Sequence, residues 1–336
     1  MDRYNFILPN MVNIKARMID AFRELVISSP ADGDRFFEDY SPGNTIDLVN
    51  QPSERFHDYE IMLLILLEVD ADKYKSIHKG TPFYFMGWLA FDMRNYESAM
   101  FYMSAALAED KRKSVGQPFE AWINNPAGQF FSLDQGDQSS YVTSILAAFI
   151  NNAIYLFKTN NPDFDITPEI FIDKFTRTML KEELYSFVTA VYTFIMEYEE
   201  LYINLILTNM NINSLEPILL NLFKGALIFE SLLKHYYPNQ NNGIPVRQIS
   251  HFSHNSAFCS DFSGCRMSQT KNTLIEIINE VAGLDYKSTF ETTAKLRNTT
   301  GHKLLWDNVF SDITNYKKLY EQEIMAILYV ITKQWT

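Results

Sequence analysis

An arginine and a histidine near the C-terminal end of the chain have side chains suited to chemistry on a phosphate ester. The segment 294–302 reads AKLRNTTGH and places Arg297 five positions before His302, with Asn298 next to the arginine. A guanidinium group binds a phosphate through two parallel hydrogen bonds and stabilises the negative charge that develops on it. An imidazole with an ordinary pKa of about 6.5 can take a proton from a ribose 2′-OH near neutral pH.

These two side chains do not share a face of a regular helix, because five residues correspond to a rotation of about 140°. The residues between them, Asn298 to Gly301, are poor helix formers, and glycine readily adopts a left-handed turn. We therefore expect a helix to end near Arg297 and the chain to turn, so that His302 comes back toward the guanidinium. The alternative is an arginine and a capping histidine with only a structural role at the end of a helix.

The elements around this motif are expected to be helices. Apolar residues recur at three-and-four spacing through 214–237, and similar patterns cover 269–282, 287–297 and 312–334. A polar segment at 238–268 separates the first of these helices from the others and is longer than most structured connections. Alternating period-two segments are scarce throughout the chain, which predicts an all-α fold with a four-helix-like C-terminal unit.

In this context the C-terminal half resembles the HEPN superfamily, named for higher eukaryotes and prokaryotes nucleotide-binding. The family motif is an arginine, a polar residue that is often asparagine, three to five further residues and a histidine, and Arg297, Asn298 and His302 match it. The motif follows the third helix of a four-helix bundle, and an earlier helix carries FESLLK at 229–234. The resemblance covers roughly residues 190–336.

The resemblance implies a metal-independent endoribonuclease that leaves 2′,3′-cyclic phosphate and 5′-OH ends. In such an enzyme His302 is the general base or acid, Arg297 holds and polarises the scissile phosphate, and Asn298 orients the arginine or the RNA. Active members usually form homodimers with a composite site, and many act as toxins or in defence against phage. Some toxins carry a tyrosine two positions after the histidine as the target of a partner nucleotidyltransferase, whereas this chain has Leu304.

A second group of residues has the composition of a zinc site. Both cysteines of the chain and two of its six histidines lie within 15 residues, and zinc accepts four nitrogen or sulfur ligands in a tetrahedral arrangement. These residues are His251, His254, Cys259 and Cys265. A structural zinc would keep the long polar segment ordered, and the alternative is a mobile loop whose thiols have no common role.

The N-terminal half is expected to be a separate helical region. Residues 1–183 form the predicted regulatory or partner-binding region, and residues 184–336 form the predicted HEPN-like domain. The segment 81–110 resembles a single tetratricopeptide (TPR) unit, in which Gly87 would permit close approach of two antiparallel helices. The alternative is an ordinary helical hairpin with small residues at its crossing.

Charge and composition limit the remaining function classes. The net charge is −12 in 336 residues, and residues 1–183 carry 17 Lys and Arg against 27 Asp and Glu. This acidic balance disfavours a protein that coats nucleic acid nonspecifically, but it leaves room for a small basic cleft in the nearly neutral C-terminal half. Two cysteines and the lack of a signal-like or membrane-spanning segment predict a cytoplasmic protein.

The expected partners are RNA, a second copy of the chain, and a protein or antitoxin at the N-terminal half. The alternative function is a non-catalytic helical adaptor that dimerises through its C-terminal bundle.

Overall fold

The protein is predominantly helical in the part of the chain that the structure describes. The structure is a computed structural model and describes residues 12–28, 37, 51–118, 120–132, 141–171, 184–208, 216–267, 271, 273–301 and 313–335. Over these residues the regular elements are helices, and the only strand-like feature is an isolated antiparallel bridge between Asn239 and Pro245. The all-α prediction is therefore confirmed for these residues. None of their helices is both long enough and apolar enough to cross a bilayer.

The contacts within the chain divide it into two compact units, Met1–Thr143 and Ser144–Thr336. This division lies on the N-terminal side of the boundary at 183/184 that we expected. The end of helix α10 (Tyr141–Asn160) explains the difference, because the ring of Phe157 packs 5.0 Å from that of Tyr329 in the C-terminal unit. We call the two parts the N-terminal unit and the C-terminal unit.

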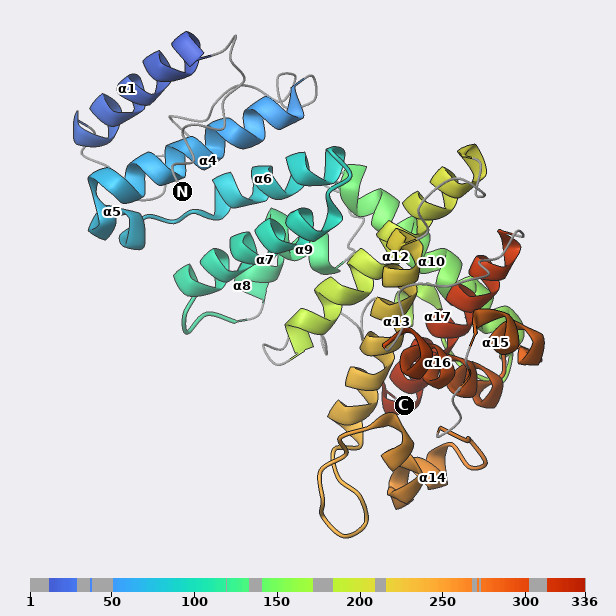
Figure 1. Cartoon of the computed structure of the whole chain (residues 1–336). Helices are drawn as coiled ribbons and strands as arrows, with labels where there is room; N and C mark the ends of the chain where they lie inside the picture. The colour runs from blue at the N-terminus through green and yellow to red at the C-terminus, as the bar shows by residue number, and fades with distance from the viewer. Residues whose placement is uncertain are drawn as a thin grey trace. The chain divides into compact units, whose positions relative to one another are not determined.

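The N-terminal unit is a series of helices in which each packs on the next (Figure 1). Helix α1 contacts α4, α4 contacts α6, α6 contacts α7, and α9 contacts both α6 and α7. The helices are α1 (Val12–Ser28), α4 (Pro52–Val69), α5 (Ala71–Ser76), α6 (Gly80–Asp92), α7 (Tyr96–Lys113), α8 (Glu120–Ile123) and α9 (Pro126–Ser132).

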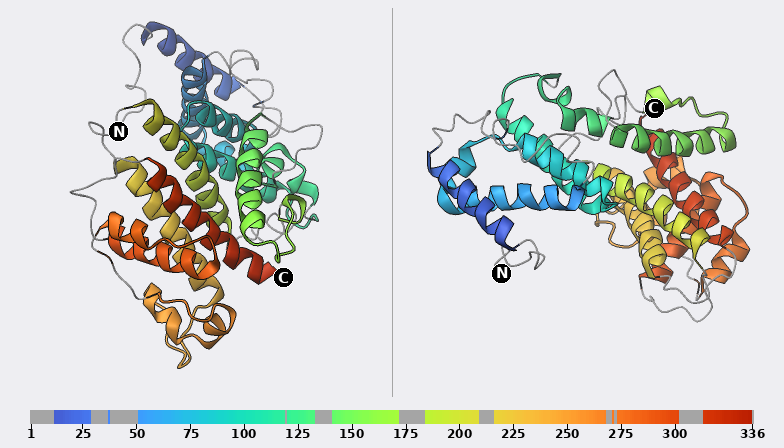
Figure 2. Two further views of the ribbon diagram at one scale, coloured as in Figure 1. Left: turned by 90° about the vertical axis from the view of Figure 1, so that its right-hand side faces the viewer. Right: turned by 90° about the horizontal axis from the view of Figure 1, so that it is seen from above.

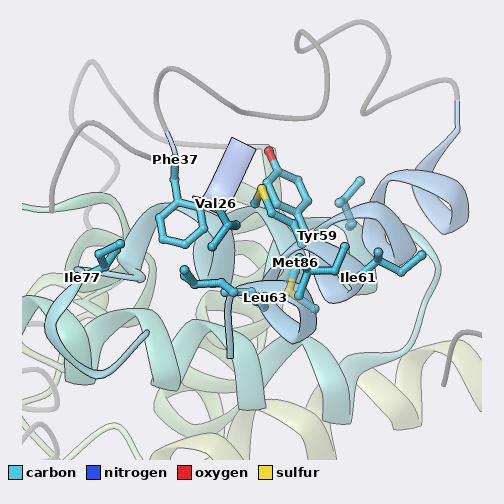
Figure 3. Close-up of a cluster of buried hydrophobic side chains, with 11 residues drawn as sticks. Val26, Phe37, Tyr59, Ile61, Leu63, Ile77 and Met86 are labelled. Atoms are coloured by element: carbon cyan, nitrogen blue, oxygen red, sulfur yellow. The ribbon is translucent and has the colours of Figure 1, made fainter. Parts of the chain in front are cut away.

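The side chains of α1, α4 and α6 bury one apolar core. Val26, Tyr59 and Met86 come from these three helices, and they converge with Phe37 and Leu63 in Figure 3. Tyr59 is fully buried, as are Ile65 and Leu66 on the same helix. Burial on several faces explains why α4 has an almost continuous apolar sequence rather than one narrow stripe.

Helices α6 and α7 approach each other closely at Gly87, as the sequence predicted. A Cβ atom at Gly87 would lie 2.8 Å from Met103 Cγ and 3.2 Å from the carbonyl oxygen of Ala99. The connection between the helices is short, and Asn95 caps α7 by accepting a hydrogen bond from the Ser98 N–H at 3.2 Å. A side chain at position 87 would therefore separate the two helices or displace Met103.

The C-terminal unit is built around four long helices. Helix α13 contacts α12, α16 and α17, and α16 contacts α17, so α13 and α17 lie side by side in the centre (Figure 2, left). The elements after α10 are α12 (Tyr185–Leu207), α13 (Glu216–Tyr236), the 3-10 helix η4 (Ile249–His254), α14 (Ser256–Asp261), α15 (Leu274–Glu280), α16 (Tyr286–Thr300) and α17 (Thr314–Trp335). Helices α13, α16 and α17 correspond to three of the ranges expected from periodicity, which are 214–237, 287–297 and 312–334.

Candidate functional site

Helix α16 places Arg297 in its last turn. Asp285 begins the helix by accepting hydrogen bonds from the backbone N–H groups of Lys287 and Ser288, both at 3.1 Å. Phe290 and Leu296 are fully buried against the rest of the unit, which orients the helix about its axis. Arg297 lies next to Leu296 and keeps 29% of its side chain exposed. The core contacts of α16 therefore direct this guanidinium to the surface.

The helix does not end near Arg297 as we expected, but continues to Thr300. Thr299 and Thr300 are buried, the Thr299 hydroxyl donates to the backbone oxygen of Lys271 at 3.0 Å, and the Thr300 hydroxyl donates to that of Leu296 at 2.6 Å. These bonds satisfy the two hydroxyls inside the fold and offset their low helix propensity. Gly301 follows with φ −62°, so the expected left-handed turn at this position is also wrong.

Arg297 is held by a buried carboxylate on α13. Its Nε donates to Glu230 Oε2, and Lys234 Nζ lies 2.7 Å from Glu230 Oε1. The Glu230 side chain is 3% exposed, whereas Lys234 is 36% exposed. A carboxylate that is removed from water is stable here because each of its oxygens meets a cation.

The orientation of Arg297 leaves much of its binding capacity for another molecule. The contact to Glu230 uses Nε, and among the described residues no partner is found for the two terminal nitrogens. Those nitrogens can form the paired hydrogen bonds that a phosphate accepts. Glu230 thus anchors the guanidinium through Nε, while the side chain as a whole remains 29% exposed.

Glu230 is a site residue that was not predicted from the sequence. It entered only as part of the FESLLK segment that supports the family resemblance. Its signal is an acidic residue on the apolar side of a helix, between Phe229 and two leucines at 232 and 233 that are all buried. A buried carboxylate needs a cationic partner, but 67 residues separate it from Arg297, and sequence alone does not identify that partner.

Of the other two motif residues, Asn298 lies within the described part of the chain and His302 does not. Asn298 is half-buried in the same turn as Arg297, and no hydrogen bond of its side chain to another described residue is found. His302 lies outside the residues that the structure describes, as does Leu304. The expected pairing of His302 with Arg297 therefore stays a prediction. Gly301 brings the chain to the position just before His302, with Phe223 of α13 beside it.

The four candidate zinc ligands do not assemble into a metal site. All four lie in described segments, and within these segments no group of three or more His, Cys, Asp or Glu side chains is suited to hold a metal ion. Instead, His251 Nδ1 lies 3.3 Å from Gln240 Nε2, and Cys259 Sγ donates to the Ser253 carbonyl at 3.4 Å. His254 contributes its backbone oxygen, which accepts from Asn241 N at 2.9 Å.

Aromatic packing orders this segment without a metal. Phe258 is buried at the centre, with the rings of Tyr237, Phe252 and Phe262 at 5.4–5.5 Å from its own. Phe262 in turn packs 4.8 Å from Phe290 of α16, so the segment is attached to the core of the unit. The polar composition of residues 238–268 did not predict this small aromatic core.

The remaining candidate ligand, Cys265, has a thiol whose protonated form is favoured. Burial, together with the nearby charge of Glu291, raises the pKa of this thiol to about 12. Both cysteines are free thiols.

Comparisons with protein-family models, with curated proteins and with solved structures found no match to this chain. Its function is therefore inferred from its own residues and from the geometry around Arg297.

Proposed function

We propose that the protein is a metal-independent endoribonuclease of the HEPN type. The observation that carries this proposal is the arginine at the end of α16, which a buried carboxylate holds through Nε while the side chain remains 29% exposed. The contact with Glu230 uses Nε, so the two terminal nitrogens are the groups proposed to bind the phosphate. The motif histidine follows this arginine by five residues, within reach of the same surface by chain length.

In the proposed reaction the ribose 2′-OH is the nucleophile. His302 accepts the 2′-OH proton, O2′ forms a bond to phosphorus, and the bond from phosphorus to the 5′-oxygen breaks. A proton passes to the leaving 5′-oxygen, so the products are a 2′,3′-cyclic phosphate and a 5′-OH. The terminal nitrogens of Arg297 stabilise the charge that develops on the phosphate oxygens, and Asn298 orients the RNA or the arginine.

The wider role is part of the same proposal. Two copies of the chain would bring their motifs to one cleft, and the N-terminal unit, with its TPR-like α6–α7 hairpin, would bind a regulatory protein or antitoxin. The close crossing of α6 and α7 at Gly87 supports the hairpin part of this proposal. A toxin or phage-defence role fits such an arrangement, because an uncontrolled cytoplasmic ribonuclease needs restraint.

The test is cleavage of total cellular RNA in the presence of EDTA, with the ends of the products identified chemically. Wild-type protein should produce cyclic phosphates, and a substrate with 2′-deoxy residues should stay intact. Replacing Arg297 with alanine should lower the rate by roughly a hundredfold to a thousandfold, as expected for loss of one charge-stabilising group. Arg297→Lys keeps the charge but not the paired donors, so it should recover only part of the rate.

Arg247→Ala is the matched control, because Arg247 is exposed and lies in the segment between α13 and η4, outside the motif. This variant should cleave as fast as wild type, and circular dichroism should show that all variants are folded. Equal cleavage by the wild type, Arg297→Ala and His302→Ala would contradict the proposal.

The non-catalytic adaptor is a second candidate, and a groove between α12 and α13 favours it. The groove has a volume of about 400 Å³ and apolar walls that include Phe187, Leu227 and Leu232, and Leu227 is 37% exposed. A second copy of the chain could cover this surface. A stable dimer that Leu227→Asp dissociates, in a protein that cleaves no RNA, would favour the adaptor over the ribonuclease.

A further inference from the structure

The N-terminal unit contains a cavity that the proposed ribonuclease does not use. It lies where α6 and α7 meet the start of α9 and has a volume of about 340 Å³. This volume is at the small end of the range for ligand-binding cavities. Its polar lining comes from His78, Thr81, Tyr84, Asp110, Lys113 and Asn125.

A histidine–aspartate pair forms one wall of this cavity. His78 Nε2 lies 3.0 Å from Asp110 Oδ1, and the two side chains are 17% and 9% exposed. Because an ionised carboxylate only accepts hydrogen bonds, Asp110 fixes the Nε2–H form of the ring and leaves Nδ1 as its other polar atom. Among the described residues no partner for Nδ1 is found.

Gly80 makes room for this pair. A Cβ atom at Gly80 would lie 2.5 Å from His78 Cε1 and 3.0 Å from Asp110 Oδ1. Any other residue at this position would push the ring away from the carboxylate. The first residue of α6 thus allows a histidine before the helix to reach an aspartate near the end of α7.

A separate ion-pair network holds the same helix ends in place. Glu109 accepts hydrogen bonds from the backbone N–H of Lys79 at 3.1 Å and from Arg112 at 2.7 Å, and Lys79 Nζ lies 3.2 Å from its other oxygen. Lys79 Nζ also donates to the backbone oxygens of Tyr74 and Ile77. These contacts link the start of α6 to the end of α7 and so hold in place the helix ends that carry His78 and Asp110.

We propose that this cavity binds a small aromatic anion of the size and type of a nucleoside monophosphate. Tyr84 and Phe85 supply aromatic surface for a planar ring, and Asn125 and His78 supply hydrogen-bonding groups for its edge. Lys113 supplies a cation for the phosphate, while the charge of Asp110 is directed to His78. The cavity is too small for an RNA chain, so its ligand differs from the substrate of the proposed RNA site.

The test is isothermal titration calorimetry of the full chain with AMP and UMP as probes. At least one of them should bind saturably, and more tightly than the matching nucleoside or ribose 5-phosphate, which each lack one recognised part. Lys113→Met should weaken this binding by about tenfold, the effect of one charge-assisted contact. Ala106→Leu should abolish binding, because Ala106 lines the cavity and is fully buried.

Two matched variants establish whether the nucleotide binds in this cavity. Lys111→Met removes the same charge two residues away, where the ammonium lies over the Trp122 ring at 4.6 Å, and it should bind the nucleotide as wild type does. Arg297→Ala should also bind normally. The proposal is overturned if neither nucleotide binds, if Lys111→Met and Lys113→Met weaken binding equally, or if Arg297→Ala abolishes it. The last result would place the nucleotide at the RNA site instead.

Discussion

Glu109 in the N-terminal unit and Glu230 in the C-terminal unit each bridge two cations, but the more deeply buried member of the ion pair is the lysine in the first network and the glutamate in the second. In the N-terminal unit the cation is buried, since the Lys79 side chain is 6% exposed and its partner Glu109 is 14% exposed. In the Glu230 network of the C-terminal unit the anion is buried, since Glu230 is 3% exposed and Arg297 is 29% exposed. The first network links the residue before α6 to the end of α7. The second fixes an arginine at the surface, where it can meet a ligand.

The largest effect should come from removing the glutamate of the N-terminal network. Glu109→Ala leaves the buried Lys79 ammonium without its carboxylate, which we expect to lower the free energy of unfolding by about 3 kcal/mol. Urea denaturation at pH 7 measures this loss. Glu109→Gln is the matched control and should lose less, because its amide oxygen can still accept from the Lys79 N–H.

Removing the glutamate of the C-terminal network should cost less stability. After Glu230→Ala both Arg297 and Lys234 can turn to water, so we expect a loss of about 1–2 kcal/mol, mainly from the void that remains. Urea denaturation again gives the value. If Glu230→Ala lost as much unfolding free energy as Glu109→Ala, the loss would not depend on whether the cation or the anion of the pair is buried.

The same substitution should affect RNA cleavage more than stability. Without Glu230 the guanidinium of Arg297 loses its anchor, and we expect cleavage to slow by roughly tenfold to a hundredfold through misplacement. Glu230→Gln should restore part of the rate, because its amide oxygen can accept from Arg297 Nε. If a folded Glu230→Ala protein cleaved RNA as fast as wild type, the proposal that Glu230 positions Arg297 would be contradicted.

The smallest expected signals are opposite pH dependences of two glutamates. Burial alone would raise the pKa of Glu109, but hydrogen bonds from Arg112 and Lys79 outweigh it and lower the pKa below 4.5. Glu109 therefore stabilises the fold above the unfolded-state pKa, and this contribution is lost as the pH falls through the folded-state pKa. The stability difference between wild type and Glu109→Gln should shrink in acid.

Glu323 should show the opposite sign. It is fully buried on α17, has no hydrogen-bond partner for either carboxylate oxygen among the described residues, and its pKa is raised well above 4.5 by burial. Its protonated form is favoured in the folded state, so the contribution of Glu323 to the stability of the wild type should fall as the pH rises above the unfolded-state pKa. Glu323→Met keeps a similar length without a charge, and its advantage over wild type should grow with pH in urea titrations. A constant difference from pH 5 to pH 8 would contradict this assignment.

Local patterns in the sequence were enough to predict the all-α fold and several of the long helices. Periodic apolar residues identified α13 and α17 to within a few residues, and the absence of a side chain at Gly87 identified the close crossing of α6 and α7. These features depend on neighbours three or four residues away, or on one residue type with a single steric property. Arg297 could be selected for the same reason, because its motif lies within a short stretch of chain.

Contacts between distant segments were not predictable in this way. The helix continues through Asn298 and Thr299 because the threonine hydroxyl finds the backbone oxygen of Lys271, 28 residues earlier. The segment with the candidate zinc ligands is ordered by rings that meet Phe290 from another helix. In the first case local helix propensity predicted an earlier helix end. In the second case the polar composition predicted a zinc site or a mobile loop. Contacts with distant residues decided both structures.

The amino-acid sequence alone was sufficient to predict that the chain is helical and that Arg297 is a candidate for binding phosphate. Packing between helices was needed to show that Glu230 anchors that arginine and that His78 meets Asp110 beside a cavity. This difference follows from the range of each interaction. Helix formation is encoded within a few turns of chain, whereas a buried charge acquires its partner only when packing brings separate helices together.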